Sequence, residues 1–237
     1  MEKNIGIILA GGSGQRVGGD IPKQFLLIAG KTILEHTLSV FQECGCIDEI
    51  FIITHSHYLK QTEEMIQGSH FSKVTQILPG GNERYHSTLA ALKACPEPEC
   101  NLIIHDAVRP LLTSQMIYDC VEALQKFTAC TTAIPSTDTL LVCDDTHCYI
   151  KDIPNRNFLY NIQTPQAFWK SILIQAYQLA SLDPDFCATD DCGVIKKYLP
   201  EIRIKIIKGS PSNFKITYPN DLITARKLLS KLDEQPH

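Results

Sequence analysis

Residues 5–25 read IGIILAGGSGQRVGGDIPKQF, in which a six-residue apolar run opens directly into a glycine-rich loop. Five glycines fall within residues 11–19 together with Arg16, and Lys23 follows shortly after them. A strand that ends in glycines and leads into a helix is the context in which backbone N–H groups bind phosphate. The stretch therefore predicts a buried strand whose carboxyl end faces an anionic ligand.

The same alternation of apolar strand and amphipathic helix continues as far as residue 106. Strand-like runs cover residues 5–10, 49–54, 73–78 and 101–106, and segments of helical period cover residues 32–44, 58–66 and 83–95. This pattern is typical of right-handed crossover units and of a parallel sheet covered on both faces. We therefore expect an α/β fold with a doubly wound, mostly parallel sheet. Ligands bind beyond the carboxyl ends of such strands, so the loops after Leu9, Leu78 and Ile104 should share one crevice.

The pattern changes after residue 135. Residues 139–153 read TLLVCDDTHCYIKDI, two strand-like pieces around a polar turn, which predicts a β-hairpin arm over residues 139–156. An isolated hairpin has little core of its own, so we expect it to pack on a second subunit. The rest should form a helix at 171–180, a short helix near 190–199, a strand at 203–209 and a last helix at 220–232. We expect one domain, residues 1–237, with the arm as its dimerisation element.

Composition excludes several classes of protein. The net charge is −4 and lysines and arginines form no runs, which argues against a general nucleic-acid surface. No apolar run is long enough to span a membrane and the N-terminal residues do not resemble a signal peptide, so a cytoplasmic protein is expected. The ten cysteines should then stay reduced, and none of their close pairs has the two-residue gap of a zinc or redox motif.

The glycine spacing argues against two common phosphate-binding motifs. Gly12, Gly14 and Gly18 stand at relative positions one, three and seven, whereas the dinucleotide fingerprint requires one, three and six. No acidic residue ends the run at 49–54 to bind a ribose, and Gly30-Lys31-Thr32 lacks the first glycine of a Walker motif. A loop that also carries Arg16 and Lys23 suits a triphosphate, since each charge-assisted contact can contribute about 1.5 to 3 kcal/mol. The alternative is a glycine-rich turn with two solvated charges.

Residues 9–25, LAGGSGQRVGGDIPKQF, resemble the signature loop of sugar-nucleotide pyrophosphorylase-type nucleotidyltransferases. Their PKQF ending is similar to the cytidylyltransferases that act on 2-C-methylerythritol 4-phosphate and on ribitol 5-phosphate. Further matches follow in order: GKTILEHTL (30–38), GGNERYHS (80–87), HDAVRP (105–110), RNFLYNIQTPQAF (156–168), ATDD (188–191) and NFKITYPNDL (213–222). The resemblance implies a Rossmann-like, GT-A-like nucleotidyltransferase that transfers CMP from CTP to a phosphorylated polyol, releases pyrophosphate and uses Mg²⁺.

In such a reaction the nucleophile and the electrophile are both anionic, so the site needs cations more than bases. The resemblance assigns catalysis to Arg16, Lys23 and Lys215, with the two lysines on opposite sides of the α-phosphorus. Asp106, at the end of a strand, is the candidate Mg²⁺ ligand, because magnesium favours one or two carboxylates plus substrate oxygens. By the same resemblance the CTP-binding residues are Ala10, Gly11, Gly12, Gly14, Gly80, Gly81, Asn82, Arg84, Ser87 and Ala107.

The resemblance also implies an acceptor site. Its residues are Arg109, Thr139, Arg156 and Thr164, with Thr139 and Arg156 reaching the partner's site across a homodimer. Structural roles stay open for several of these positions: Arg109 could anchor its loop through carbonyls, Arg84 could pin a helix start, and residues 138–139 and 155–156 could simply form turns. Thr189 could be a helix N-cap. His105 is expected to be a packed, hydrogen-bonded residue and not a metal ligand.

The acceptor itself is left open by the sequence. LAGG, HDAVR and TDDCG stand where methylerythritol-phosphate enzymes usually read LAAG, HDAAR and TDEAS. LAGG, HDAVRP and DIPNR beside QTPQ resemble the pentitol-phosphate branch more closely, which favours ribitol 5-phosphate or a related pentitol phosphate. The alternative is 2-C-methylerythritol 4-phosphate, a substrate of isoprenoid biosynthesis, since one methylene is worth only about 1 to 3 kcal/mol of discrimination. A catalytically silent nucleotide-binding regulator and a NAD-linked reductase are the rivals from other classes. Cations gathered around one phosphorus atom argue against the regulator.

Overall fold

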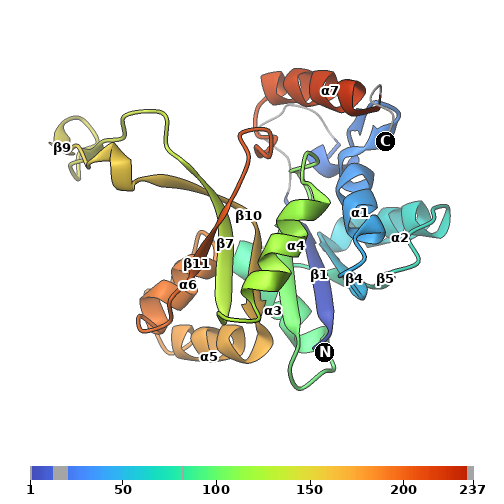
Figure 1. Cartoon of the computed structure of the whole chain (residues 1–237), viewed down its shortest axis with the longest axis horizontal. Helices are drawn as coiled ribbons and strands as arrows, with labels where there is room; N and C mark the ends of the chain where they lie inside the picture. The colour runs from blue at the N-terminus through green and yellow to red at the C-terminus, as the bar shows by residue number, and fades with distance from the viewer. Residues whose placement is uncertain (1, 13–20, 82, 234–237) are drawn as a thin grey trace.

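The computed structural model describes residues 2–12, 21–81 and 83–233, with side chains as far as Ser230. In this part of the chain seven strands form the main sheet, in the order β11–β7–β10–β6–β1–β4–β5 (Figure 1). They are β1 (Asn4–Ala10), β4 (Glu49–Thr54), β5 (Val74–Pro79), β6 (Asn101–Asp106), β7 (Ala129–Pro135), β10 (Tyr160–Trp169) and β11 (Lys205–Lys208). Strand β10 pairs antiparallel with β6 and β7, and the other neighbouring pairs are parallel. The predicted mostly parallel sheet is confirmed.

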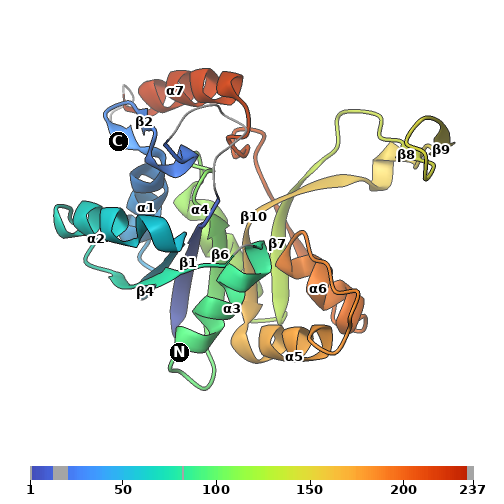
Figure 2. The same ribbon diagram turned by 180° about the vertical axis from the view of Figure 1, so that it is seen from behind.

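Helices cover both faces of this sheet. Side chains along a strand point alternately to the two faces, so the buried residues of β1 divide between two cores. Ile5, Ile7 and Leu9 of β1 join the core under α3 (Arg84–Ala94), α5 (Lys170–Ala180) and α6 (Asp191–Tyr198), which Figure 2 shows. Ile8 and Ala10 join the core under α1 (Ile33–Glu43), α2 (Leu59–Gln67) and α4 (Ser114–Ala123). The sheet is therefore doubly wound.

Helix α1 shows how local sequence sets one of these layers. It begins at a capping box, in which the Glu35 backbone N–H donates to Thr32 Oγ1 and the Glu35 carboxylate accepts from the Thr32 backbone N–H. Its buried residues include Leu34, Leu38 and Phe41, at helical spacing. The Phe41 ring fills the space over Gly6 of β1, where a Cβ atom would lie 2.6 Å from Phe41 Cδ1. Glycine at position 6 is thus required by the packing of α1.

A third, smaller core lies at the carboxyl edge of the sheet. It joins the hairpin of β2 (Leu27–Ile28) and β3 (Lys31–Thr32) to helix α7 (Pro219–Asp233). Ile216 is fully buried in this cluster, and its backbone N–H donates to the Val108 carbonyl over 2.9 Å. The segment that carries Lys215 is thereby held against the loop that follows β6.

Strands β8 (Val142–Cys143) and β9 (Ile150–Asp152) form a two-stranded antiparallel hairpin that stands away from the main sheet in Figures 1 and 2. The 3-10 turn η4 (Arg156–Phe158) leads from it back into β10. Several apolar side chains here are more than half exposed: Leu141, Tyr149, Ile150, Ile153 and Phe158, the last 81% exposed. A sheet this small buries too little surface to be stable alone.

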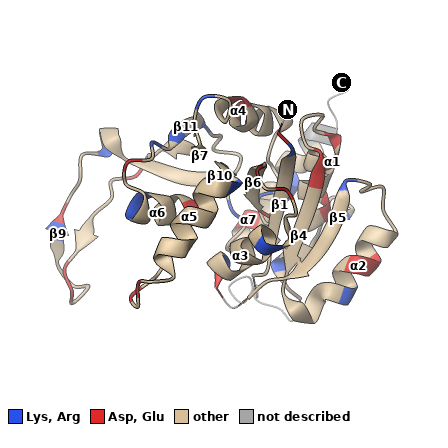
Figure 3. Cartoon of the chain, turned by 90° about the horizontal axis from the view of Figure 1, so that it is seen from below, with Lys and Arg blue, Asp and Glu red and all other residues tan. Residues whose placement is uncertain are grey.

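Charge and cysteine distribution follow the composition. Lys and Arg are interspersed with Asp and Glu over the elements of the chain, as Figure 3 shows. All ten cysteines are free thiols, as expected. Among the residues that the structure describes, no helix combines the length and the apolar character needed to cross a lipid bilayer.

Candidate active site

Three loops meet beyond the carboxyl ends of β1, β5 and β6. The Ser87 hydroxyl lies where the first two meet, since a Cβ atom would come within 2.6 Å of Ser87 Oγ at Gly80 and within 3.4 Å at Gly11. Gln24 Nε2 donates to the Ala10 carbonyl over 2.7 Å, which fixes the end of β1. The loops after β1 and β5 therefore lie next to each other, and Leu9 of β1 pairs with Asp106 of β6, so the three strand ends adjoin, as expected. Gly14, Arg16 and Asn82 lie outside the described residues.

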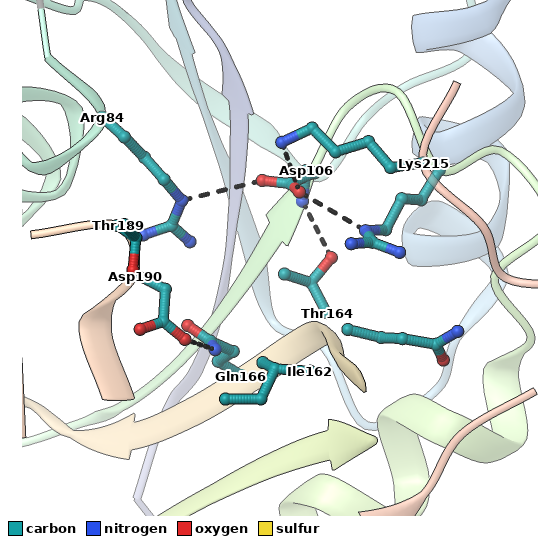
Figure 4. Close-up of a pocket in the computed structure, with 10 residues that line it drawn as sticks. Arg84, Asp106, Ile162, Thr164, Gln166, Thr189, Asp190 and Lys215 are labelled. Atoms are coloured by element: carbon teal, nitrogen blue, oxygen red, sulfur yellow. Dashed lines mark hydrogen bonds and ion pairs between the residues drawn. The ribbon is translucent and has the colours of Figure 1, made fainter. Parts of the chain in front are cut away.

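Asp106 ends β6 and is the electrostatic centre of the site (Figure 4). Its Oδ2 accepts from Lys215 Nζ at 3.1 Å and from Arg109 Nε at 3.4 Å, and its Oδ1 lies 3.7 Å from Arg84 Nε. Asp106 is 7% exposed. Burial raises the pKa of Asp106, but the charges of Lys215, Arg84 and Arg109 outweigh that effect and hold the pKa well below its usual range. Asp106 is therefore an anion within a positively charged cluster.

This cluster lines a cavity of about 260 Å³. The lining residues are Arg84, Asp106, Arg109, Ile162, Gln163, Thr164, Gln166, Thr189, Asp190 and Lys215. The volume is below the roughly 300–1,000 Å³ typical of sites for drug-sized ligands, and suits a small, charged molecule. Of the residues named from the sequence, the cavity brings together Arg84, Asp106, Arg109, Thr164 and Lys215.

Lys23 is bound to the segment that carries Lys215. It begins the 3-10 turn η2 (Lys23–Phe25), is 8% exposed, and donates from Nζ to the Ile216 carbonyl over 3.1 Å. Ile216 follows Lys215 directly, so two lysines far apart in sequence are tied to one short segment. Ala107 is fully buried, and its carbonyl accepts from Thr37 Oγ1 over 2.9 Å.

His105 is a packed residue, as expected. Its Nε2 bonds the Arg109 carbonyl at 3.1 Å, and its Nδ1 bonds Thr164 Oγ1 at 2.9 Å. A carbonyl only accepts, so Nε2 carries the proton, and Thr164 donates to Nδ1 while accepting from the Asp106 backbone N–H at 3.1 Å. Burial lowers the pKa of His105 to about 4, which keeps the ring neutral. The chain of bonds fixes Thr164 beside Asp106.

Arg109 both lines the cavity and anchors its surroundings. Its Nη1 donates to the Asn213 carbonyl over 2.8 Å, and Asn213 Nδ2 donates to the Thr164 carbonyl over 2.7 Å. Burial lowers the pKa of the Arg109 guanidinium. The carbonyl contact expected if Arg109 anchors its loop is therefore present, together with the ion pair of Arg109 to Asp106.

The sequence reasoning missed a second buried network, behind Arg84. Arg84 Nη1 contacts Asp191 Oδ2 at 2.5 Å, and Tyr177 donates to Asp191 Oδ1 over 2.7 Å. Gln166 Nε2 donates to Asp190 Oδ2 over 2.7 Å. The segment ATDD is the signal that could have found these contacts.

The N-cap of α6 corrects one alternative considered for this segment. The cap is Asp190, whose Oδ1 accepts from the Gly193 backbone N–H over 2.8 Å, and not Thr189. The helix therefore begins at Asp191, one residue later than a cap at Thr189 would require, and this first residue contacts Arg84.

Thr139 and Arg156 lie on the hairpin arm and its return. Arg156 Nη1 donates to the Thr137 carbonyl over 3.0 Å, a contact within the arm. Neither residue belongs to the lining of the cavity described above. Within one chain, the structure therefore keeps these two residues apart from the Asp106 cluster.

A doubly wound, mostly parallel sheet with this cluster at its carboxyl edge defines a Rossmann-like nucleotidyltransferase. The sequence profile of 2-C-methyl-D-erythritol 4-phosphate cytidylyltransferase matches residues 5–231. The chain is 40% identical over 227 residues to that enzyme from Thermobifida fusca, covering 94% of this chain and 91% of the relative. A crystal structure of 4-diphosphocytidyl-2C-methyl-D-erythritol synthase from Anaerococcus prevotii superposes with a TM-score of 0.84 at 31% identity, covering 97% of this chain and 96% of that one.

A further relative carries a different name. The chain is 49% identical over 229 residues to the bifunctional ribulose 5-phosphate reductase/CDP-ribitol pyrophosphorylase Bcs1 of Haemophilus influenzae. The match covers 95% of this chain but 48% of that relative, so the chain spans about half its length. The chain belongs to the 2-C-methyl-D-erythritol 4-phosphate cytidylyltransferase family and is a CTP-dependent cytidylyltransferase.

Proposed function

We propose that this enzyme transfers CMP from CTP to a pentitol phosphate, ribitol 5-phosphate or a close relative, and releases pyrophosphate. The observation that carries the proposal is the gathering of Arg84, Arg109 and Lys215 around Asp106 in one cavity. The 49% identity to a relative named for CDP-ribitol supports the pentitol. The family profile and the other relatives named above support the alternative acceptor, 2-C-methylerythritol 4-phosphate.

In the proposed reaction a phosphate oxygen of the acceptor attacks the α-phosphorus of CTP. The bond from that phosphorus to the bridging oxygen breaks, and pyrophosphate leaves with the electron pair. Lys23 and Lys215 would neutralise charge on the phosphorus from two sides, with Arg16 at the remaining phosphates, and the cytosine and ribose would lie by Gly80, Gly81 and Ser87. Electrostatic stabilisation of this kind is the main catalytic term in phosphoryl transfer.

The site fits a magnesium ion that has Asp106 as its one carboxylate ligand. Lys215 and Arg109 both contact Asp106 Oδ2, whereas Oδ1 has the longer 3.7 Å contact with Arg84 Nε among the described residues, which leaves lone pairs for a cation. No group of three or more His, Cys, Asp or Glu side chains in the described ranges could hold a metal by itself, so substrate phosphates would complete the shell. When bound, Mg²⁺ would offset charge on the triphosphate.

We further propose that the enzyme is a cytoplasmic homodimer joined by the arm. Exposed Leu141, Tyr149, Ile150 and Phe158 give the arm an apolar surface of the kind that marks protein–protein contacts. Thr139 and Arg156 lie on this arm, and would bind the acceptor phosphate in the partner's cavity. One active site would then need two chains.

The test of the reaction is pyrophosphate release from CTP with ribitol 5-phosphate, 2-C-methylerythritol 4-phosphate, ribulose 5-phosphate and glycerol phosphate. We expect turnover with the pentitol phosphate, and turnover with 2-C-methylerythritol 4-phosphate alone would select the alternative acceptor. Thermal stabilisation by CTP without pyrophosphate release from any acceptor would instead indicate the silent regulator. Lys23→Ala and Lys215→Ala should each lower kcat by at least about 100-fold, and full turnover of Lys215→Ala would contradict its role.

The test of the shared site is complementation. Arg156→Ala and Lys23→Ala are each expected to be nearly inactive alone, but a mixed dimer holds one site with neither substitution. Mixing the two variants should therefore restore part of the activity. No recovery, with both variants dimeric by light scattering, would favour sites built within one subunit.

A further inference from the structure

Two buried polar atoms of the cavity have no hydrogen-bond partner. Among the described side chains these are Arg84 Nη2, a donor, and Gln166 Oε1, an acceptor. Both residues line the cavity, and Figure 4 shows them on the side bounded by Thr189 and Asp190. A buried polar atom without a partner is unfavourable, and in a native site it calls for a physical explanation.

The orientation of both groups is fixed by neighbouring residues of one helix start. Asp191 holds Arg84 Nη1 at 2.5 Å, while Asp106 faces Arg84 Nε, so Nη2 is the nitrogen left over. Asp190 accepts from Gln166 Nε2 at 2.7 Å, and a carboxylate only accepts, so the amide cannot flip and Oε1 is the atom left over. Consecutive aspartates therefore orient the donor and the acceptor, which belong to two residues that line the same cavity.

A hydroxyl group can satisfy both atoms at once, because its oxygen accepts and its hydrogen donates. A phosphate oxygen cannot do so, since it would meet the acceptor Gln166 Oε1 without a proton. The pair also lies in the cavity that holds the Asp106 cluster but faces Thr189 and Asp190, which carry no positive charge.

We propose that Arg84 Nη2 and Gln166 Oε1 form a subsite that binds one hydroxyl of the polyol acceptor. This inference rests on the proposed function for the identity of the acceptor, and it adds the group by which the enzyme would recognise a polyol. Gln163, which lines the same cavity, cannot take this role: its amide donates to the Ser210 carbonyl at 2.8 Å and accepts from the Ser210 backbone N–H at 3.3 Å.

The test is calorimetric binding of ribitol 5-phosphate, 2-C-methylerythritol 4-phosphate and their monodeoxy analogues to the full chain. For the parent that binds, we expect one deoxy analogue to bind about 10- to 100-fold more weakly, because it leaves a charged donor and an acceptor unpaired. In Gln166→Met that difference should shrink to about 3-fold or less. In Gln163→Met, the matched control on the same strand, the full difference should persist.

Thermal unfolding and circular dichroism establish that each variant is folded, and Arg84→Lys, which loses Nη2 but keeps the charge, provides a second test if Gln166→Met does not fold. Equal binding of all deoxy analogues by the wild type would overturn the subsite. So would a difference between parent and deoxy analogue that stays unchanged in Gln166→Met and in Arg84→Lys. Discrimination in binding without pyrophosphate release would leave the subsite intact and remove the proposed reaction. Binding of no polyol phosphate would remove both.

Discussion

Replacing Asp191 by asparagine tests whether the buried network behind Arg84 stabilises the fold. Asp191 is 0% exposed and receives both Arg84 and Tyr177. Removing one partner of a buried ion pair typically costs 3–5 kcal/mol, because the remaining charge stays buried without compensation. The Arg84 side chain is 21% exposed and keeps its contact with Asp106, so we expect the lower end, about 3 kcal/mol.

The measurement is equilibrium urea unfolding, followed by circular dichroism, at pH 7. A loss of about 3 kcal/mol corresponds to a decrease of roughly 6–12 °C in Tm for a chain of this size, and should lower the urea midpoint without changing the slope. Asp190→Asn is the matched control, since it changes the adjacent residue in the same way. Asparagine caps helices as well as aspartate does, but its single oxygen cannot also accept from Gln166 Nε2, so this variant should lose about 1.5 kcal/mol, half the loss expected for Asp191→Asn.

Equal effects of the two substitutions would refute the reasoning, because they would mean that burial and the contact with Arg84 add nothing to the contribution of Asp191. A loss below about 1 kcal/mol in Asp191→Asn would do the same. Tyr177→Phe separates the two partners: it removes only the hydroxyl that donates to Asp191 Oδ1 over 2.7 Å. We expect it to cost about 1.5 to 3 kcal/mol, as for hydrogen bonds to charged groups.

Two further predictions concern the fold. Gly6→Ala places a methyl group 2.6 Å from Phe41 Cδ1, and should lower the free energy of unfolding in urea by about 1–3 kcal/mol. The double variant Gly6→Ala with Phe41→Leu should lose less free energy of unfolding than the sum of the two single losses. Lys197 and Tyr198 donate to Asp183 and lower its pKa to about 2, so the ionised carboxyl stabilises the fold above about pH 4 and loses this effect as the pH falls towards 2. Asp183→Asn should therefore lower the urea midpoint at pH 7, with the difference from wild type shrinking below pH 4; a constant difference would contradict the assignment.

The parallel half of the fold follows from local sequence, and the site does so in part. Short, mainly apolar runs between helical segments, such as residues 101–106, indicate buried parallel strands, and the polar residues at their carboxyl ends then share an edge. Asp106 and Arg109 are found in this way. Lys215 lies 109 residues from Asp106, and Lys23 lies 193 residues from the carbonyl it binds, so neither contact has a local signal. For Lys215 only the family resemblance pointed to the site, whereas Lys23 was also indicated by its place just after the glycine-rich loop.

Asp191 and Gln166 were missed for a related reason. The pattern ATDD is equally typical of a helix cap. Arg84 lies 107 residues from Asp191 in the sequence, and only the tertiary fold brings the two together and so distinguishes the inward Asp191 from the capping Asp190. Gln166 follows Pro165 in what proves to be a central strand, where proline is rare because it cannot donate to a neighbour. The segment 160–169 was therefore not predicted as a strand.

The antiparallel strand β10 contributes a large part of the lining of the cavity and also carries the arm. Because it runs antiparallel between β6 and β7, its amino-terminal half lies at their carboxyl ends, with Gln166 opposite Ile104 and Tyr160 opposite Pro135. Its register with β7 shifts between Ile162 and Gln166, and the cavity is lined here by Ile162, Gln163, Thr164 and Gln166. A parallel strand in the same place would have presented its carboxyl end, and the arm would have left the sheet elsewhere. One reversed strand thus links the arm, through η4, directly to the groups that surround Asp106.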